Sequence, residues 1–176
     1  MKRMPWIERR FSFDLPVSVL PNVIERLRGT PERIDERLRG LARECLTHRI
    51  DGSWSIQENI GHLIDVELLW HGRLDDFDAG LATLRPADMT NQRTVQAEYN
   101  VRPITEILDQ FRVSRMRLVE RLEGLDEAAA GRSAMHPRLA RPMRVIDMTV
   151  FAAEHDDHHL ARVTELLRVL IPNRSA

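Results

Sequence analysis

Three of the seven histidines have a spacing that could bind a metal ion. His155 and His159 are four residues apart on the apolar face of a helical segment, and His62 lies on the apolar face of an earlier one. Residues four apart on a helix are neighbours, with Cβ atoms about 5–6 Å apart, so two imidazoles can reach one ion. Three neutral imidazole nitrogens leave a coordination position open, which is typical of a catalytic metal. Zinc, nickel or another divalent ion that prefers imidazole would suit this set.

The alternative interpretation is that these histidines are core residues. A single histidine on an apolar face usually satisfies one hydrogen bond and binds nothing. Three buried imidazoles without partners would be costly, so the spacing alone leaves a shared ion and a core role both open. A di-iron site is rejected because it needs two Glu-x-x-His pairs, and only Asp156 with His159 resembles one. His158 lies at the edge of the apolar stripe.

Charged residues on the same helix faces are candidates for catalysis. Asp65, three residues after His62, could orient a ligand imidazole or move a proton. Arg162, on the face of the C-terminal pair, could bind a carboxylate through two hydrogen bonds. Arg162 could also pair with an acidic neighbour at the end of a bundle, and we favour that interpretation. Glu58 has a competing role, because Ser55 to Glu58 is a capping box.

The composition excludes several classes of enzyme. Of the 26 basic residues only Lys2 is a lysine, which argues against Schiff-base, pyridoxal-phosphate and P-loop chemistry. The formal net charge is −1, and phosphate binding needs a concentrated basic face, so we expect no nucleic acid partner. The single cysteine, Cys45, is predicted to pack in the core, and its lack of a partner favours a reducing compartment. No apolar run could span a membrane, and we expect a cytoplasmic protein.

The elements that must position these residues are predicted to be helices. We expect one all-α domain over residues 1–176, built as a four-helix bundle with a short extra N-terminal helix. That extra helix is predicted to run from Ser18 to Arg28 and to end at Gly29. Residues 81–102 form a connection long enough to cross the bundle, and residues 125–142 are predicted to be a loop. The bundle helices are expected at about residues 31–48, 55–79, 103–123 and 145–170.

The histidine-bearing segments resemble the DinB / YfiT-like superfamily of metal-dependent proteins. The likeness is carried by Trp54 to Glu67 and by Ala153 to Arg162, and it extends to the segments 28–31 and 136–139. The resemblance implies a bundle in up-down-down-up order and a homodimer. It also implies a divalent metal, with the ligand positions falling on His62, His155 and His159. Characterised members of the family include thiol transferases and isomerases that use bacillithiol, mycothiol or glutathione.

Three functions follow from the residues and the resemblance together. The leading expectation is an enzyme whose divalent metal favours the thiolate of a low-molecular-weight thiol. That thiolate would be transferred or added to an electrophilic small molecule. The second is a non-catalytic stress or binding protein, dimeric and stabilised by the metal. The third is metal-assisted hydrolysis with Asp65 as the general base. Trp6, Trp54 and Trp70 are predicted to be packing residues.

Overall fold

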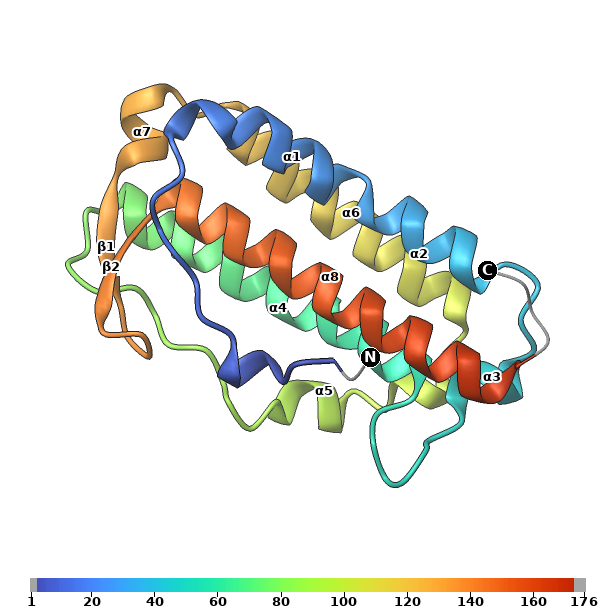
Figure 1. Ribbon diagram of the computed structural model, residues 1–176. Helices are drawn as coiled ribbons and strands as arrows, with labels where there is room; N and C mark the ends of the chain where they lie inside the picture. The colour runs from blue at the N-terminus through green and yellow to red at the C-terminus, as the bar shows by residue number, and fades with distance from the viewer. Residues whose placement is uncertain (1–2, 173–176) are drawn as a thin grey trace.

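The computed structural model describes residues 3–172 and consists mainly of long, packed helices (Figure 1). The sequence predicts helices over 55–79, 103–123 and 145–170, and the structure has α4, α6 and α8 over Ile56–Asp78, Ile104–Glu123 and Val145–Leu170. The remaining segment of the bundle is α1 followed by α2, over Leu20–Arg28 and Thr30–Leu38. Lys2, the single lysine, lies outside the described residues.

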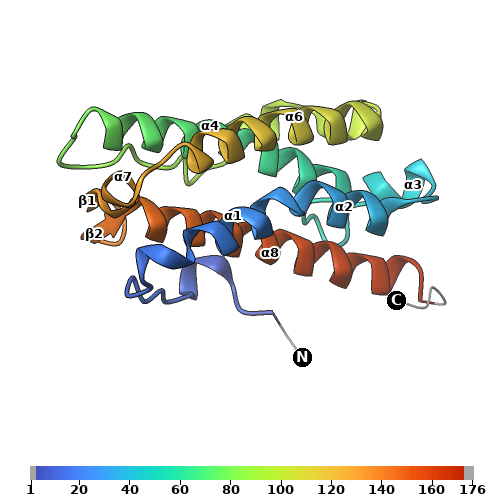
Figure 2. The ribbon, with the colours of Figure 1, turned by 90° about the horizontal axis from the view of Figure 1, so that it is seen from above.

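The helices form the predicted up-down-down-up bundle. The α1–α2 segment and α8 run in one direction, and α4 and α6 run in the other (Figures 1 and 2). Both α4 and α1 pack against α6 and α8, so α4 lies diagonally opposite α1. This arrangement brings the inner faces of α4 and α8, which carry the three histidines, into direct contact.

The first segment of the bundle differs from the sequence prediction. Instead of one helix over residues 31–48, α2 ends at Leu38 and a separate short helix, α3, covers Arg43–Thr47. Gly40 has a φ of 74°, a left-handed conformation that ends the helix and that glycine adopts most easily. Gly29, in contrast, keeps a right-handed backbone with φ −78° and ψ −8°. The predicted extra helix, α1, therefore continues in line with α2 as part of the bundle.

The predicted loop over residues 125–142 and the connection over residues 81–102 both contain short elements. After α6 come α7, over Glu127–Gly131, and an antiparallel hairpin of β1 and β2, over Ser133–His136 and Arg141–Arg144. The connection from α4 to α6 contains α5, over Gln92–Gln96, and a 3-10 helix over Tyr99–Val101. Both pack against α4. No helix in the described part of the chain is long and apolar enough to cross a membrane.

A buried ionic cluster joins the helices at the centre of the bundle. Arg115 of α6 is fully buried although it lies in a run rich in charged residues. Its Nε donates to Glu67 of α4 at 2.9 Å, and its Nη2 donates to Asp156 of α8 at 3.0 Å. Thr30 of α2 donates to the same Asp156 at 2.8 Å. Buried charges are tolerated only when each keeps its ionic partner. Arg115 therefore belongs to the core of the bundle.

Candidate metal centre

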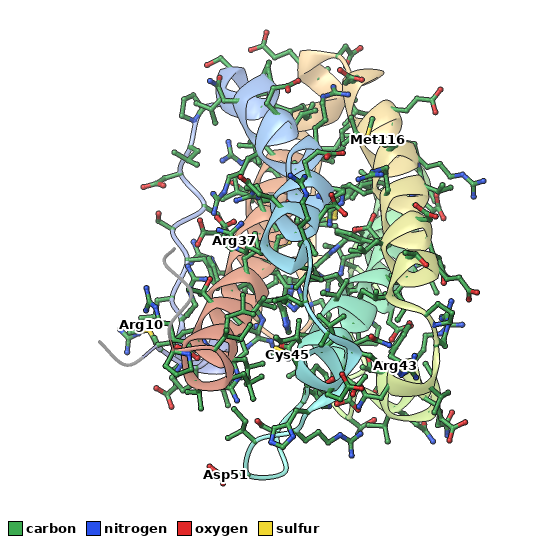
Figure 3. The ribbon with its side chains drawn as sticks, turned by 90° about the vertical axis from the view of Figure 1, so that its right-hand side faces the viewer. Arg10, Arg37, Arg43, Cys45, Asp51 and Met116 are labelled. Carbon is green, nitrogen blue, oxygen red and sulfur yellow. The ribbon has the colours of Figure 1, made fainter. Side chains whose placement is uncertain are left out.

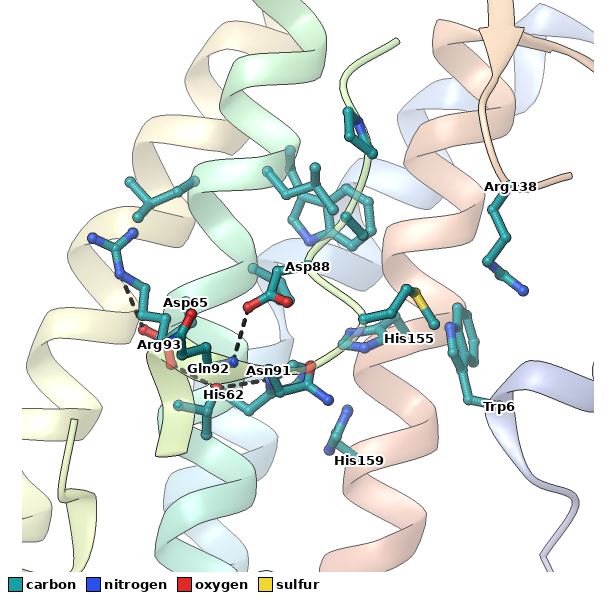
Figure 4. Close-up of a pocket in the computed structure, with 18 of the residues that line it drawn as sticks. Trp6, His62, Asp65, Asp88, Asn91, Gln92, Arg93, Arg138, His155 and His159 are labelled. Carbon is teal, nitrogen blue, oxygen red and sulfur yellow. Dashed lines mark hydrogen bonds and ion pairs between the residues drawn. The ribbon is translucent and has the colours of Figure 1, made fainter. Parts of the chain in front are cut away.

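The three predicted histidines meet inside the bundle. His62 projects from α4, and His155 and His159 project from α8 (Figure 4). The ring centres of His155 and His159 are 4.6 Å apart, and His62 is 5.3 Å from the first and 4.9 Å from the second. One nitrogen of each ring lies within 4.8 Å of the others, and all three side chains are buried. This group could hold a metal ion.

The ring of His62 is oriented by a chain of hydrogen bonds. Its Nδ1 lies 3.0 Å from Oγ1 of Thr94, and that hydroxyl donates to Asp65 at 2.8 Å. The hydroxyl of Tyr99 donates to the other oxygen of Asp65 at 2.9 Å. Because an ionised carboxylate only accepts, the Thr94 hydroxyl must in turn accept from His62. This assignment places the proton on Nδ1 and leaves the lone pair of Nε2 for a ligand.

The other two histidines differ in how their Nδ1 atoms are satisfied. Nδ1 of His159 lies 3.0 Å from Oδ1 of Asn59, whose amide nitrogen donates to the carbonyl oxygen of Ser55 at 2.7 Å. Nδ1 of His155 is buried and has no hydrogen-bond partner within the described chain. A core histidine is expected to be satisfied. The orphaned nitrogen and the neutral donor set therefore fit a metal site better than a core role.

Burial keeps the three imidazoles neutral. It lowers the pKa of His62 from 6.5 to about 4. Burial, with neighbouring histidines adding to it, lowers the pKa of His155 and of His159 well below the ordinary value. A metal ligand must offer a deprotonated nitrogen, and these rings do so throughout the neutral pH range.

A cavity of about 1130 Å³ lies beside the three histidines. Its walls are rich in aromatic rings: the Trp54 ring centre is 4.9 Å from that of His62, and the Trp6 ring centre is 5.0 Å from that of His155. Trp6 comes from the N-terminal arm, which returns beside α8. His158 also lines the cavity, but it contacts Arg3 of the arm and lies outside the three-nitrogen group.

Two of the charged candidates have other partners. Arg162 donates to Ser53 Oγ at 2.7 Å and to Glu165 at 3.3 Å, and it lines a separate, smaller pocket. The pairing with an acidic neighbour is therefore observed, and this geometry gives no support to a carboxylate-binding role beside the histidines. Glu58 forms the predicted capping box. Cys45, in α3, is half-buried against the core (Figure 3) and does not line the cavity.

Several residues that complete the site were not predicted from the sequence. Asn59 and Arg73 precede and follow His62 on α4 by three and eleven residues, spacings that return to one side of a helix. That periodicity could have identified them. Thr94 and His136 lie in connections whose paths no helical pattern predicts, although both face the cavity.

Comparison with known proteins gives a family and a fold. The family model of the DinB superfamily matches residues 26–163. The search of curated proteins gives no match. YfiT from Bacillus subtilis, described as a probable metal-dependent hydrolase with an unusual four-helix bundle topology, has a TM-score of 0.80. It is 18% identical, and the match covers 93% of this chain and 94% of YfiT.

Two further solved structures are similar at lower scores. The colibactin self-resistance protein ClbS, in complex with double-stranded DNA, has a TM-score of 0.68 and 12% identity over 85% of this chain and 95% of that one. A mycothiol-dependent maleylpyruvate isomerase has a TM-score of 0.65 and 13% identity, covering 89% of this chain and 63% of the isomerase. At these identities each likeness shows the fold alone.

Proposed function

The chain belongs to the DinB superfamily, and on that premise we propose that it is a metal-dependent enzyme acting with a low-molecular-weight thiol. The reaction is the transfer or addition of the thiol to an electrophilic small molecule. The observation that carries this proposal is the neutral cluster of His62, His155 and His159 opening onto the large cavity. A structural metal site would instead be closed, with all its ligands supplied by the protein.

The ligand set fits a divalent ion such as zinc or nickel. His62 and His159 would present Nε2, because Thr94 and Asn59 bind their Nδ1 atoms. Bound there, the metal would supply a Lewis acid that lowers the pKa of a thiol or of water.

The size of the cavity supports a reaction of two molecules. Ligand pockets for single small molecules are typically about 300–1,000 Å³, and this cavity is about 1130 Å³. It can therefore accommodate a thiol of the size of glutathione, bacillithiol or mycothiol beside a smaller electrophile. Support for a thiol also comes from the fold shared with an isomerase that depends on mycothiol.

Asp65 is the carboxylate that we assign to the histidine end of the cavity. Burial raises its pKa, while the hydrogen bonds from Thr94 and Tyr99 oppose that shift. Its first role is to position His62 through Thr94. Because it also lines the cavity, we propose that it accepts a proton released from a bound thiol.

Metal-assisted hydrolysis is the second candidate, and the presence of Asp65 on the cavity wall favours it. A carboxylate there could take a proton from an attacking water molecule, and YfiT is described as a probable metal-dependent hydrolase. The two proposals differ in one observable. Product formation by a thiol enzyme requires a thiol, whereas hydrolysis of an ester or amide continues without one.

The first experiment measures metal content in protein purified without a histidine tag. We expect about one divalent ion per chain in the wild type and none in a His62→Ala, His155→Ala, His159→Ala variant. His158→Ala is the matched control, because His158 lines the cavity outside the three-nitrogen group, and it should keep the ion. Metal-loaded protein is then assayed for thiol consumption with an electrophile and for thiol-independent ester hydrolysis.

Absence of metal from every sample, even after reloading with zinc, nickel and manganese, would make the histidines core residues and remove the proposed mechanism. Retention of the ion but no activity with or without thiol would favour a metal-stabilised, non-catalytic protein. Sedimentation of the wild type at several concentrations tests the homodimer that we propose with this function.

A further inference from the structure

Arg73 of α4 is a buried cation that forms no salt bridge within the described chain, and Asp76 acts on it only from a longer distance. It is 1% exposed and lines the cavity. Its Nε donates to the carbonyl oxygen of Arg85 at 3.3 Å, whereas Nη1 has no hydrogen-bond partner. Burial lowers its pKa to about 10, so it remains charged at neutral pH. A buried charge without a salt bridge is costly. Natural proteins accept such costs mainly at functional sites.

The nearest acidic residue on the helix is already occupied. Asp76, three residues after Arg73, accepts from the Arg85 backbone at 2.8 Å and from its Nε and Nη2 at 3.0 and 2.7 Å. Arg85 reaches Asp76 by crossing α4 at Gly72, where a Cβ atom would lie 2.0 Å from Nη1 of Arg85. The absence of a side chain at Gly72 therefore allows Arg85 to neutralise Asp76. Arg73 lines the cavity without that carboxylate as a direct partner.

Arg138 and His136 lie at the same end of the cavity, and of these two Arg138 carries a charge at neutral pH. Arg138, in the turn of the β1–β2 hairpin, lines the cavity and makes no hydrogen bond or ion pair with the described residues (Figure 4). His136 is buried beside it, and burial, Arg73 and Arg138 lower its pKa to about 4. The cavity carboxylates, Asp65 and Asp88, accept hydrogen bonds from the connection that contains α5. The hairpin end of the cavity is therefore positively charged, and neither of the two cavity carboxylates neutralises it.

This basic end is aligned with the histidines along α4. Arg73 is eleven residues after His62, about three turns, which returns to the same face roughly 16 Å along the axis. Helical side chains lean toward the N-terminus, so the guanidinium leans back toward the histidines. Trp70 stands between the two ends, with its ring 5.8 Å from the Arg73 guanidinium carbon and 6.1 Å from the His155 ring centre.

From these contacts we propose that Arg73 and Arg138 form an anion subsite for a carboxylate, at the opposite end of the cavity from the three histidines. The carboxylate belongs either to an acidic substrate or to a thiol that carries a carboxylate, such as glutathione. Guanidinium groups bind carboxylates through paired, charge-assisted hydrogen bonds. The inference rests on the proposed function for its place in a reaction, but binding at the subsite requires no metal.

The test uses metal-free protein with succinate as the probe and its neutral diamide, succinamide, as the comparison. Calorimetric titration should show that succinate binds at least ten-fold more tightly than succinamide. Arg73→Met and Arg138→Met should each weaken succinate binding ten-fold or more. Arg121→Met is the matched control, because Arg121 pairs with Asp75 and Asp78 outside the cavity, and it should bind succinate as the wild type does.

Thermal unfolding of the same variants gives a second readout. Arg73→Met should raise the Tm of the metal-free protein, because it removes an unpaired buried charge and keeps a side chain of similar volume. A purely structural arginine would instead lower the Tm when it is replaced. If Arg73→Met fails to fold, the exposed Arg138→Met variant carries the binding test alone. Equal succinate binding by the wild type and the cavity variants, or no preference over succinamide, would overturn the proposal.

Metal-loaded enzyme then identifies the source of the carboxylate. If succinate raises the KM for glutathione and cysteamine replaces glutathione poorly, the subsite binds the thiol. If succinate instead raises the KM for an acidic electrophile, the subsite binds the substrate. Protein that binds succinate but no metal keeps this inference and loses the proposed function. Protein that binds metal but not succinate does the reverse.

Discussion

The substitution Gly61→Ala tests how the fold positions His62. Gly61 of α4 faces the ring of Tyr99, and a Cβ atom built there would lie 2.2 Å from Cδ2 and 2.3 Å from Cγ of that ring. Tyr99 is 3% exposed, so the ring cannot swing into solvent without opening the core. The Tyr99 hydroxyl donates a hydrogen bond to Asp65, which also accepts one from Thr94, and the Thr94 hydroxyl is hydrogen-bonded to His62. A single methyl group should therefore disturb the whole chain of hydrogen bonds.

The expected magnitude combines three effects. Overpacking a tight site costs about 1–3 kcal/mol. Losing the hydrogen bond from Tyr99 to a carboxylate costs about 1.5–3 kcal/mol. Alanine is better than glycine in a helix by about 1 kcal/mol, which offsets part of the loss. The unfolding free energy of Gly61→Ala should fall by about 1.5–5 kcal/mol. Its zinc affinity should fall by about 10- to 100-fold, as is typical when partners of metal ligands are lost.

Gly72→Ala is the matched control on the same helix. Its Cβ atom would also be too close to a neighbour, but that neighbour is the end of the Arg85 side chain, which is 45% exposed and can move aside. Asp76 would keep its hydrogen bond from the Arg85 backbone and would have Arg73 as a nearby cation. We expect a stability change within about 1 kcal/mol, since the gain in helix propensity offsets the ion pair, and an unchanged zinc affinity.

Urea unfolding of the metal-free proteins measures the first quantity, and zinc competition against a chromophoric chelator measures the second. Equal losses of stability and zinc affinity in Gly61→Ala and Gly72→Ala would show that the effect comes from adding a methyl group to α4 and not from its contact with Tyr99. A stable Gly61→Ala protein with wild-type zinc affinity would refute the role of Tyr99 and Asp65 in orienting His62.

Three further predictions concern single contacts. Thr94→Val removes the hydroxyl that orients His62, and competition titration should show a zinc affinity about 10- to 100-fold weaker. The folded-state pKa of His136, about 4, lies below its ordinary value of 6.5. Its contribution to stability is therefore complete above pH 6.5 and is lost toward pH 4 as the unfolded chain takes up the proton. The pH dependence of urea unfolding should be shallower over that window in metal-free His136→Asn. Arg115→Met should lower the unfolding free energy by about 3–5 kcal/mol, because it leaves Glu67 and Asp156 buried without their cation. Urea unfolding that matched the wild type would contradict that expectation.

The parts of the site that could be predicted from the sequence depend on local spacing. His155 and His159 share a face because a helix repeats every 3.6 residues, and His62 follows a capping box that fixes where α4 begins. Their apolar faces predict that they point into the bundle, and the family resemblance implies that they meet as one ligand set. The structure shows that meeting directly.

The parts that could not be predicted depend on backbone conformation and on the paths of connections. Gly29 and Gly40 look equally able to end a helix, yet only Gly40 adopts a positive φ. Because of that difference, the first bundle segment ends at residue 38 in the structure, whereas the predicted helix ended at residue 48. Thr94 reaches His62 only because the α5 connection folds back onto α4, and no local pattern encodes that return. Hydrogen-bond partners supplied by connections are therefore the least predictable part of this site.

Two arginines that are fully buried in the described part of the chain show how ion pairing distinguishes a structural residue from one that lines the cavity. Arg115 and Arg73 are each 1% exposed or less, and neither burial nor helix position distinguishes them. Arg115 binds Glu67 and Asp156 from two other helices, so its charge is used in holding the bundle together. Arg73 has no such partner, because Arg85 occupies the nearby carboxylate. Replacement by methionine should therefore stabilise the protein at position 73 and destabilise it at position 115. If both replacements changed the unfolding free energy in the same direction, ion pairing within the fold would not determine which arginine is available to bind a ligand in the cavity.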